Sequence, residues 1–382
     1  MDNYNKIVIG KPYIEKEIEG KVKLKVDIRI GNKRPYVLWY EVDEEYSDYL
    51  CKERSDAFVI TLLLYAMKNK MDIYCEEVMT ERLYYQITEY LIPSISNEID
   101  EYDNITIHTK LTDELLSTNN SVGVALSGGV DSFYTLLRHI NRNEKSFEVT
   151  HFTFFNVGAS GDFGGDKSRK IFNDRINWIK GIAIELNKKF VSVDSNVSEL
   201  LHQRFEETSS FRNLAVPFIL QKMFSVYYLA SSFTFSGFKF TYKNPAYYDL
   251  LNIYCFSTDN IVFYLSGGET TRLGKIKFIS GYPITYDKLN VCVREVTNCS
   301  RCEKCWRTMF ELYSTGNLEL YKNVFDLSYF YSKKYLYVFK AMRYVLKRDY
   351  DWIEILKALA NNSQISRFQR MLFYIINKIV NK

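Results

Sequence analysis

The stretch Val124-Ala125-Leu126-Ser127-Gly128-Gly129-Val130-Asp131-Ser132 runs from an apolar segment into a polar turn with two glycines. It predicts a buried strand over 122–126 followed by a helix over 133–140. Because glycine has no Cβ, the N–H groups of Gly128 and Gly129 can approach an anion closely, and both residues can adopt a positive φ. The following helix directs its unpaired N–H groups at the same place. The stretch therefore predicts a loop that holds phosphate groups.

Asp131 is the unusual member of this loop. A carboxylate beside phosphates repels them unless a metal ion bridges the two, so we expect Mg²⁺ between Asp131 and a nucleotide. Ser127 and Ser132 add hydroxyl donors. The loop lacks the lysine that a Walker A motif requires. The alternative interpretation is a tight strand–helix turn whose Asp and Ser only cap the helix.

Residues Ser127–Ser132 resemble the Ser-Gly-Gly-x-Asp-Ser signature of the PP-loop ATP pyrophosphatases, an adenine nucleotide alpha hydrolase-like superfamily. The resemblance implies that ATP is cleaved between its α and β phosphates, that AMP is placed on a substrate oxygen, and that the loop holds pyrophosphate. It implies these nucleotide-binding residues: Leu126, Ser127, Gly128, Gly129, Val130, Asp131, Ser132, Asn156 and Val157. The catalytic residues would be Ser127, Asp131, Ser132 and Arg212.

Four of the seven cysteines lie close together near the C-terminal side of the chain. Such clustering in a cytosolic chain is typical of metal binding and not of disulfides. Cys292, Cys299, Cys302 and Cys305 offer four soft ligands with the spacing of a tetrahedral Zn²⁺ site. An iron–sulfur cluster and unligated or redox-active thiols are the alternatives.

A PP-loop followed by this cysteine pattern resembles the 7-cyano-7-deazaguanine synthase family, which acts in queuosine-type deazapurine synthesis. The resemblance covers 122–307, about half of the chain, and Arg212-Asn213 matches an Arg-Asn pair of the family. The gap after the first cysteine is shorter than is typical of the family, and the family begins near its PP-loop. The family's Tyr-Pro-Asp substrate loop is only weakly echoed by Tyr247-Tyr248-Asp249.

Strands and helices are predicted to alternate from residue 122 onward. The expected strands are 122–126, 149–157, 190–194 and 232–238, and the expected helices are 133–140, 168–189 and 214–230. This order predicts an α/β fold with a parallel sheet covered by helices on both faces, which the resemblance identifies as a PP-loop or HUP-type core. Ligands of such sheets bind beyond the carboxyl ends of the strands.

The N-terminal part is predicted to be a small α+β domain. Apolar residues alternate with charged ones over Val22–Ile30, which is typical of a half-buried strand. The other expected elements are strands at 36–42, 73–78 and 105–109 and helices at 56–71 and 80–91. We expect three domains: 1–115, of unknown function; 116–310, PP-loop-like and ending in the cysteine site; and 311–382, helical.

Charge is distributed unevenly although the net charge is only +4. Residues 1–120 are acidic, whereas residues 333–382 are strongly basic, which favours an anionic partner or a solvated helical face. Nucleic acid is one possible partner of the basic C-terminal helices. The sequence is also compatible with an oligomer. With no apolar run of 18 residues and no secretory signal, we expect a cytoplasmic protein without a membrane partner.

The sequence contains two weaker signals. Leu265-Ser266-Gly267-Gly268 repeats the letters of Leu126–Gly129 without the Asp-Ser, and we interpret it as a turn before a helix containing Glu269, Arg272 and Lys275. His151 lies in an expected strand and is interpreted as a packed residue.

The sequence thus predicts an ATP-dependent, AMP-forming C–N ligase that activates a carboxylate or amide for a nitrogen nucleophile. The acceptor is a small molecule or a macromolecule, and the expected cofactors are ATP, Mg²⁺ and Zn²⁺. A tRNA-thiolating PP-loop enzyme and a non-catalytic nucleotide-sensing module are the alternatives.

Overall fold

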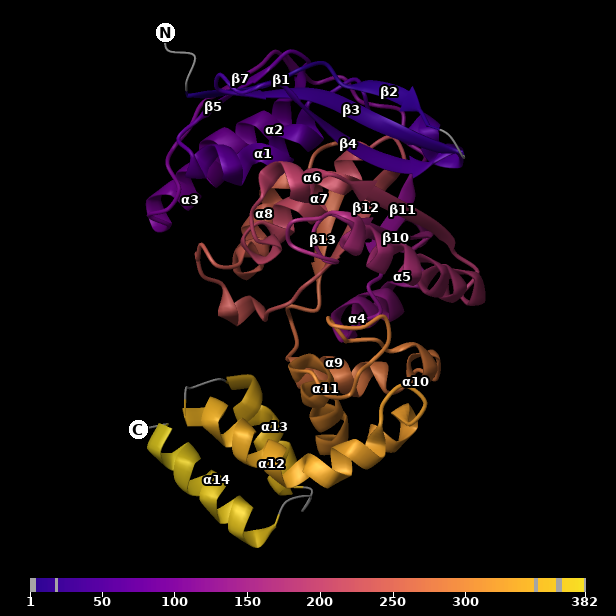
Figure 1. The fold of residues 1–382 in the computed structure, drawn as a ribbon, viewed down its shortest axis with the longest axis vertical. Helices are drawn as coiled ribbons and strands as arrows, with labels where there is room; N and C mark the ends of the chain where they lie inside the picture. Colours follow the sequence, from indigo (N-terminus) through magenta and orange to yellow (C-terminus); the bar gives the residue numbers. More distant parts are fainter. Residues whose placement is uncertain (1–4, 18–19, 347–349, 362–365, 381–382) are drawn as a thin grey trace. The chain divides into compact units, whose positions relative to one another are not determined.

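The computed structural model describes residues 5–17, 20–346, 350–361 and 366–380 (Figure 1). Its contacts divide the chain into two compact units. Unit 1 consists of Met1–Leu126 and Arg138–Gly268, and unit 2 consists of Ser127–Leu137 and Glu269–Lys382. The segment Ser127–Leu137, which contains Gly128 and Gly129, is therefore grouped by its contacts with the C-terminal part of the chain and not with the strand that precedes it.

Unit 1 is built on one large sheet of eleven strands in which parallel pairs outnumber antiparallel ones. The sheet order is β13-β12-β9-β10-β11-β4-β3-β1-β5-β7, with β2 paired to β3. The strands that the N-terminal segment contributes are β1 (Lys6–Ile9), β2 (Tyr13–Lys16), β3 (Lys21–Ile30), β4 (Tyr36–Asp43), β5 (Asp72–Cys75) and β7 (Ile107–His108). The parallel strands after it are β9 (Ser121–Ala125), β10 (His151–Asn156), β11 (Lys189–Ser195), β12 (Phe224–Ala230) and β13 (Val262–Ser266). A separate pair is formed by β6 (Met79–Thr80) and β8 (Leu111–Thr112).

The strand predicted over Val22–Ile30 is confirmed as β3. Its apolar residues are buried while the alternating charged residues are more exposed, because successive side chains of a strand point to opposite faces. It pairs antiparallel with β4 in a register that runs from Lys21↔Asp43 to Ile28↔Tyr36. Strand β4 then pairs with β11, so the N-terminal strands continue the central sheet.

Helices flank both faces of this sheet, as the α/β prediction requires. The neighbouring residues Phe154 and Phe155 of β10 point to opposite faces. Phe154 stacks on Phe172 of α5 at a ring-centroid distance of 5.1 Å, whereas Phe155 belongs to the buried cluster that contains Leu214 and Phe218 of α7. The helices of unit 1 are α1 (Asp56–Lys68), α2 (Glu81–Gln86), α3 (Ile92–Glu98), α5 (Asp166–Glu185), α6 (Val197–Leu201), α7 (Ser209–Ile219) and α8 (Asp249–Phe256).

Two predicted elements of the central region are wrong. The expected helix over 214–230 is the end of α7 followed by strand β12, and the expected strand over 232–238 contains only a single 3₁₀ turn at Phe235–Gly237. An uninterrupted apolar run does not by itself distinguish a buried strand from a buried helix, and here it covers one of each. The structure also contains β13, which the sequence analysis did not predict.

Unit 2 is helical. It consists of most of α4 (Val130–His139), which reaches unit 1 only with its last two residues, and of α9 (Arg272–Ile279), α10 (Ile284–Lys288), α11 (Glu303–Ser314), α12 (Leu327–Leu346), α13 (Tyr350–Asn361) and α14 (Arg367–Val380). The predicted helical C-terminus is confirmed. The helix predicted around Glu269, Arg272 and Lys275 is α9, but Glu269 precedes it because Thr271 caps its first turn by accepting from the Gly274 N–H.

The predicted division into three domains stays a prediction. The sheet continues from β11 into β4, and the contacts group Ser127–Leu137 with unit 2. These observations describe contacts, whereas a domain is defined by whether a segment can fold alone. Among the described residues, the structure contains no helix with the length and hydropathy needed to cross a bilayer.

Candidate functional site

The loop after β9 has the predicted strand–loop–helix order. Strand β9 ends at Ala125, and helix α4 begins at Val130. Gly128 has a φ of +80°, a conformation that residues with a Cβ rarely adopt, whereas Gly129 does not have a positive φ. Helix α4 starts earlier than expected, so Asp131 and Ser132 lie in its first turn.

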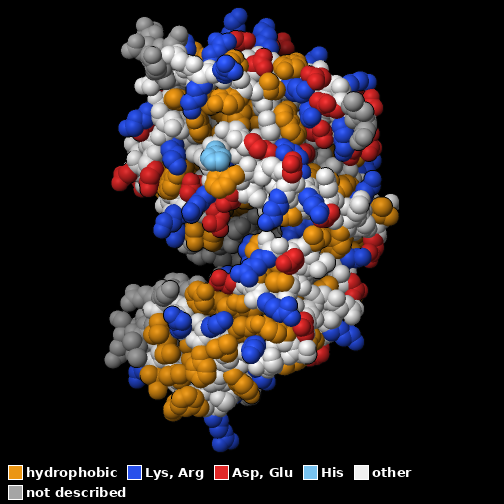
Figure 2. Space-filling model, viewed as in Figure 1, with side chains coloured by type: hydrophobic (Ala, Val, Ile, Leu, Met, Phe, Trp, Pro, Cys, Tyr) orange, Lys and Arg blue, Asp and Glu red, His pale blue; other side chains and the backbone are white. Residues whose placement is uncertain are grey.

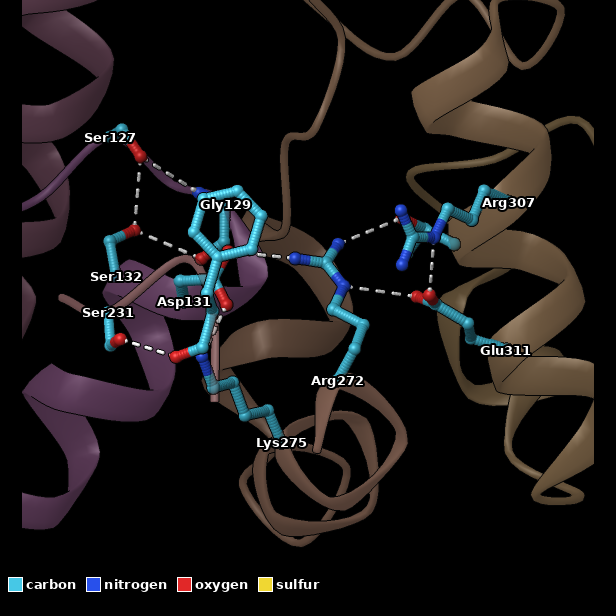
Figure 3. Close-up of polar contacts among 11 residues, drawn as sticks. Ser127, Gly129, Asp131, Ser132, Ser231, Arg272, Lys275, Arg307 and Glu311 are labelled. Atoms are coloured by element: carbon cyan, nitrogen blue, oxygen red, sulfur yellow. Dashed lines mark hydrogen bonds and ion pairs between the residues drawn. The ribbon is translucent and has the colours of Figure 1, made fainter. Parts of the chain in front are cut away.

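The loop's hydroxyl groups bond to each other and to the loop backbone (Figure 3). Ser127 Oγ donates to Ser132 Oγ at 3.2 Å and accepts from the Gly129 N–H at 3.4 Å. Ser132 Oγ in turn donates to the Gly129 carbonyl at 3.0 Å. These bonds hold the loop against the start of α4. They bring together Ser127, Ser132 and Gly129.

Asp131 is held by two cations from α9 (Figure 3). Its Oδ2 accepts from Arg272 Nη1 at 2.8 Å, and its Oδ1 accepts from Lys275 Nζ at 2.9 Å. The Lys275 side chain is only 3% exposed. Burial alone would raise the pKa of Asp131, but the charges of Arg272 and Lys275 outweigh it and hold the pKa below its usual value. The carboxylate is therefore ionised and carries two positive neighbours.

A second carboxylate fixes Arg272 from the other side. Glu311 of α11 is fully buried and accepts from Arg272 Nε at 3.3 Å and from Arg307 Nε at 3.0 Å. Arg272 also donates through Nη2 to Thr308 Oγ1 at 3.4 Å. Asp131, Glu311, Arg272, Lys275 and Arg307 thus form a cluster of two acids and three bases.

Sequence reasoning missed this charge cluster. The only signal near it was the Leu265–Gly268 echo, which pointed to a helix with Arg272 and Lys275 but not to their partner. No local pattern relates Asp131 to residues 141 and 144 positions away, because tertiary packing alone brings α9 against the start of α4.

The other predicted nucleotide-site residues lie in unit 1. Asn156 ends β10 and is buried. Its Nδ2 donates to Asp194 Oδ1 at 2.6 Å, and its Oδ1 accepts from Ser168 Oγ at 3.2 Å. The carbonyl of the next residue, Val157, accepts from Arg212 Nη1 at 3.2 Å. Asn156, Val157 and Arg212 are therefore grouped at the carboxyl end of β10.

Arg212 is a fully buried arginine of α7. Its other donors go to Ser198 Oγ at 3.2 Å and to the Gln203 carbonyl at 3.0 Å, and its Nε has no hydrogen-bond partner among the described residues. Burial lowers its pKa to about 10. Gly158, with a φ of +130°, allows this approach, because a Cβ there would lie 2.8 Å from Arg212 Nη1. The contacts show Arg212 bridging the segment after β10, helix α6 and the residues that follow α6.

The four clustered cysteines converge, as predicted, and could hold a metal such as zinc. The Sγ atoms of Cys292, Cys299, Cys302 and Cys305 all lie within 4.8 Å of one another. The Cys292–Cys302 and Cys299–Cys305 pairs are 3.9 and 4.0 Å apart. Zinc–sulfur bonds of about 2.3 Å in a tetrahedron place sulfurs about 3.8 Å apart, so the spacing fits four-coordinate zinc.

Backbone N–H groups point at two of these sulfurs. The N–H groups of Arg294 and Glu295 approach Cys292 Sγ at 3.4 Å, and the Cys302 N–H approaches Cys299 Sγ at 3.3 Å. Burial raises the pKa of Cys299, but backbone donors outweigh it and bring the pKa to about 7. Such donors stabilise thiolates, the form that binds a metal.

Asn290 connects the cysteine segment to the glycine turn. The Asn290 N–H donates to the Gly128 carbonyl at 2.8 Å, and the Asn290 side chain accepts from the Cys292 N–H at 3.2 Å. All three residues belong to unit 2. Two hydrogen bonds therefore connect the cysteine segment to the glycine turn.

In comparisons with known proteins, no family model, no curated protein and no solved structure matches this chain.

Proposed function

We propose that this chain is an ATP-dependent adenylating enzyme that forms AMP and pyrophosphate, as the PP-loop resemblance implies. The observation that supports this most is the cluster beside the glycine turn, in which Asp131 meets Arg272 Nη1 and Lys275 Nζ at 2.8 and 2.9 Å. A glycine turn, a helix start and two nearby cations are the groups that recognise a polyphosphate.

The proposed reaction begins with a carboxylate or amide oxygen of the acceptor. That oxygen attacks the α-phosphorus, the bond from this phosphorus to the α–β bridging oxygen breaks, and the electron pair leaves with pyrophosphate. A nitrogen nucleophile then attacks the adenylated carbon and expels AMP. Adenylation is required because a carboxylate or amide oxygen is a poor leaving group, whereas AMP is a good one.

The chain's own residues act on the pyrophosphate. The N–H groups of the turn and the Ser127 and Ser132 hydroxyls hold the β and γ phosphates, and Arg272 and Lys275 exchange Asp131 for phosphate oxygens when ATP enters. The freed Asp131 carboxylate would hold Mg²⁺, which neutralises charge on the leaving pyrophosphate. Both oxygens of Asp131 are engaged by Arg272 and Lys275, so the carboxylate would become available to a metal ion only once phosphate oxygens have taken over these two cations.

The four-cysteine site has a structural role in this proposal. Four thiolates leave no open position on a tetrahedral zinc, so such a metal performs no chemistry on a substrate. It would order the segment that carries Asn290 and thereby the glycine turn. An acceptor of the 7-cyano-7-deazaguanine synthase type, small or macromolecular, is the substrate class that the resemblance favours.

The test is release of AMP and pyrophosphate from ATP, measured with a panel of carboxylates and with ammonium as the nitrogen donor. Asp131→Asn should abolish release, while Asp287→Asn, which alters an exposed carboxylate of α10, should leave it unchanged. Unchanged release from Asp131→Asn in a protein that is still folded by circular dichroism would reject the mechanism.

Sulfur transfer to tRNA is less well supported by the thiols. Outside the four-cysteine site, burial raises the pKa values of Cys51, Cys75 and Cys255 to about 12, which makes them poor sulfur-carrying nucleophiles at neutral pH. Consumption of sulfide with ATP, and not of ammonia, would reverse this preference. Tight ATP binding in calorimetry without AMP under any acceptor would favour a nucleotide sensor.

A further inference from the structure

Helices α12 and α14 of unit 2 carry large apolar side chains that stay exposed. Figure 2 shows hydrophobic side chains gathered over the C-terminal helices, with Lys and Arg among them. On α14, Phe368 is 61% exposed, Met371 57% and Ile375 49%; on α12, Tyr335 is 52% and Leu336 51% exposed. Tyr331, Phe339, Leu346 and Tyr374 complete this exposed set, which we call the α12/α14 face.

The exposed apolar residues of the α12/α14 face are distinct from the buried apolar residues through which the two helices pack. The two helices contact each other, and α14 buries Phe373 completely while α12 buries Phe330 and Val345. On α14, the exposed residues 368, 371 and 375 recur at spacings of three and four, so they form one stripe on a side of the helix different from that of Phe373. A second apolar stripe that stays exposed has no role in packing the helix. Exposed apolar patches of this kind usually mark an interaction site.

The charge of these helices is of one sign. Neither Leu327–Leu346 nor Arg367–Val380 contains an Asp or Glu, whereas α12 has four Lys or Arg residues and α14 has three. Arg367 and Lys378 bracket the stripe of α14, and by helical periodicity both lie on its exposed side. The face therefore combines apolar side chains with a positive charge that no acidic residue of the same helices offsets.

We propose that the α12/α14 face docks on an anionic lipid surface. Burying exposed apolar residues such as Leu336, Met371 and Ile375 at the edge of the acyl-chain region is favourable, because it removes their surface from water. The charged backbone of a nucleic acid offers no such apolar surface. A second copy of this chain would bring like charges together on the same face. Lipid headgroups of negative charge satisfy both features, because they attract the bases while the acyl region takes the apolar stripe.

The docking is peripheral. Helix α14 has 14 residues, fewer than the roughly 20 that a membrane span requires, and it carries charged residues at both ends. A helix of this pattern lies in the plane of the interface with its apolar stripe among the upper acyl carbons. This inference does not depend on the proposed adenylation, because it rests on exposed residues of α12 and α14 and not on the glycine turn.

Co-sedimentation of the full-length protein with vesicles tests the proposal. With phosphatidylcholine vesicles containing about one third phosphatidylserine, the protein should sediment, and with phosphatidylcholine alone it should stay largely in solution, because the basic residues require anionic headgroups. Raising the salt concentration should weaken the sedimentation.

Two sets of variants separate the apolar and the charged contributions. Met371→Ser with Ile375→Ser should weaken vesicle binding by about tenfold or more, since each removes exposed apolar surface only. Arg367→Gln and Lys378→Gln should each weaken it about fivefold. The matched control is Ile184→Ser, at a residue 71% exposed in unit 1, which should bind as the unaltered protein does.

Three outcomes would overturn the inference. The first is that the protein does not sediment with anionic vesicles; binding of a nucleic acid, or a dimer that Arg367→Gln abolishes, would then identify the occupant of the face. The second is equal binding to neutral and anionic vesicles. The third is a loss of binding in the Ile184→Ser control as large as in the Met371/Ile375 variant. The vesicle experiment does not measure ATP turnover. A negative result would therefore reject lipid docking without bearing on the proposed enzyme activity.

Discussion

Asp131 of α4 and Arg272 of α9 lie 141 residues apart in sequence, yet their Oδ2 and Nη1 atoms are 2.8 Å apart. This contact joins the segment that follows the glycine turn to a helix of the C-terminal part, and both belong to unit 2. Lys275, one turn further along α9, engages the other carboxylate oxygen. The loop that the sequence singles out is thus supplied with positive charge from outside its motif.

Lys275→Gln should lower the rate of ATP-dependent AMP formation by about 10²-fold, because an interaction with the developing charge on the leaving pyrophosphate is lost. Kinetics of pyrophosphate release at several ATP concentrations measure the effect. Lys277→Gln, which alters an exposed lysine on the same helix, is the matched control and should be near normal. Equal rates for the two variants would exclude Lys275 from the site.

Glu311→Gln should destabilise the protein by about 1.5–3 kcal/mol, because Arg272, which keeps Asp131, and Arg307 both lose hydrogen bonds to a fully buried carboxylate. The free energy of unfolding in urea measures this. Glu319→Gln, at an exposed residue that accepts from the Tyr331 hydroxyl, should cost less than about 1 kcal/mol. A Glu311 variant as stable as the Glu319 variant would show that the cluster contributes nothing to folding.

Cys302→Ser should remove the bound metal, because three thiolates and a hydroxyl hold zinc far more weakly than four thiolates do. Metal analysis of the purified protein should give about one zinc per chain before the substitution and almost none after it. Cys255→Ser, at a buried thiol outside the site, should retain the metal. Iron in place of zinc would change the identity of the site, and no metal in either protein would refute it.

Metal loss should also loosen the phosphate loop, since Asn290 connects Cys292 to the Gly128 carbonyl. Hydrogen exchange of the Asn290 amide should therefore become faster in Cys302→Ser than in Cys255→Ser. The same exchange rate in both variants would show that the loop is ordered independently of the cysteine site.

Stability should fall as the pH decreases from about 6.5 to about 4, partly because of His151. Burial, with a smaller contribution from Lys189, lowers the pKa of this histidine to about 4 in the folded protein, while the unfolded chain keeps a value near 6.5. Between these values only the unfolded chain binds the proton, so acid favours unfolding, by up to roughly 3 kcal/mol. His151→Gln should have a melting temperature that depends less steeply on pH in this window. Identical slopes for the variant and the unaltered protein would contradict the lowered pKa.

Much of the architecture could be predicted from local patterns. The alternation of Val22–Ile30 specifies a strand with one buried face, and the order of apolar segments around residues 122–157 specifies alternating strands and helices. The segment 214–238 could not be predicted, because an apolar run fits a buried strand and a buried helix equally well. Only pairing with β9 and β13 selects a strand for Phe224–Ala230.

The candidate site divides in the same way between local pattern and tertiary contacts. The glycine turn and the four cysteines are visible in the sequence because each is confined to a short segment, where spacing limits geometry. Tertiary structure alone decided that Arg272 and Lys275 meet Asp131, and that Arg212 is buried against Val157. Ion pairs between distant segments leave no local pattern, because they depend on how helices pack and not on the order of neighbouring residues.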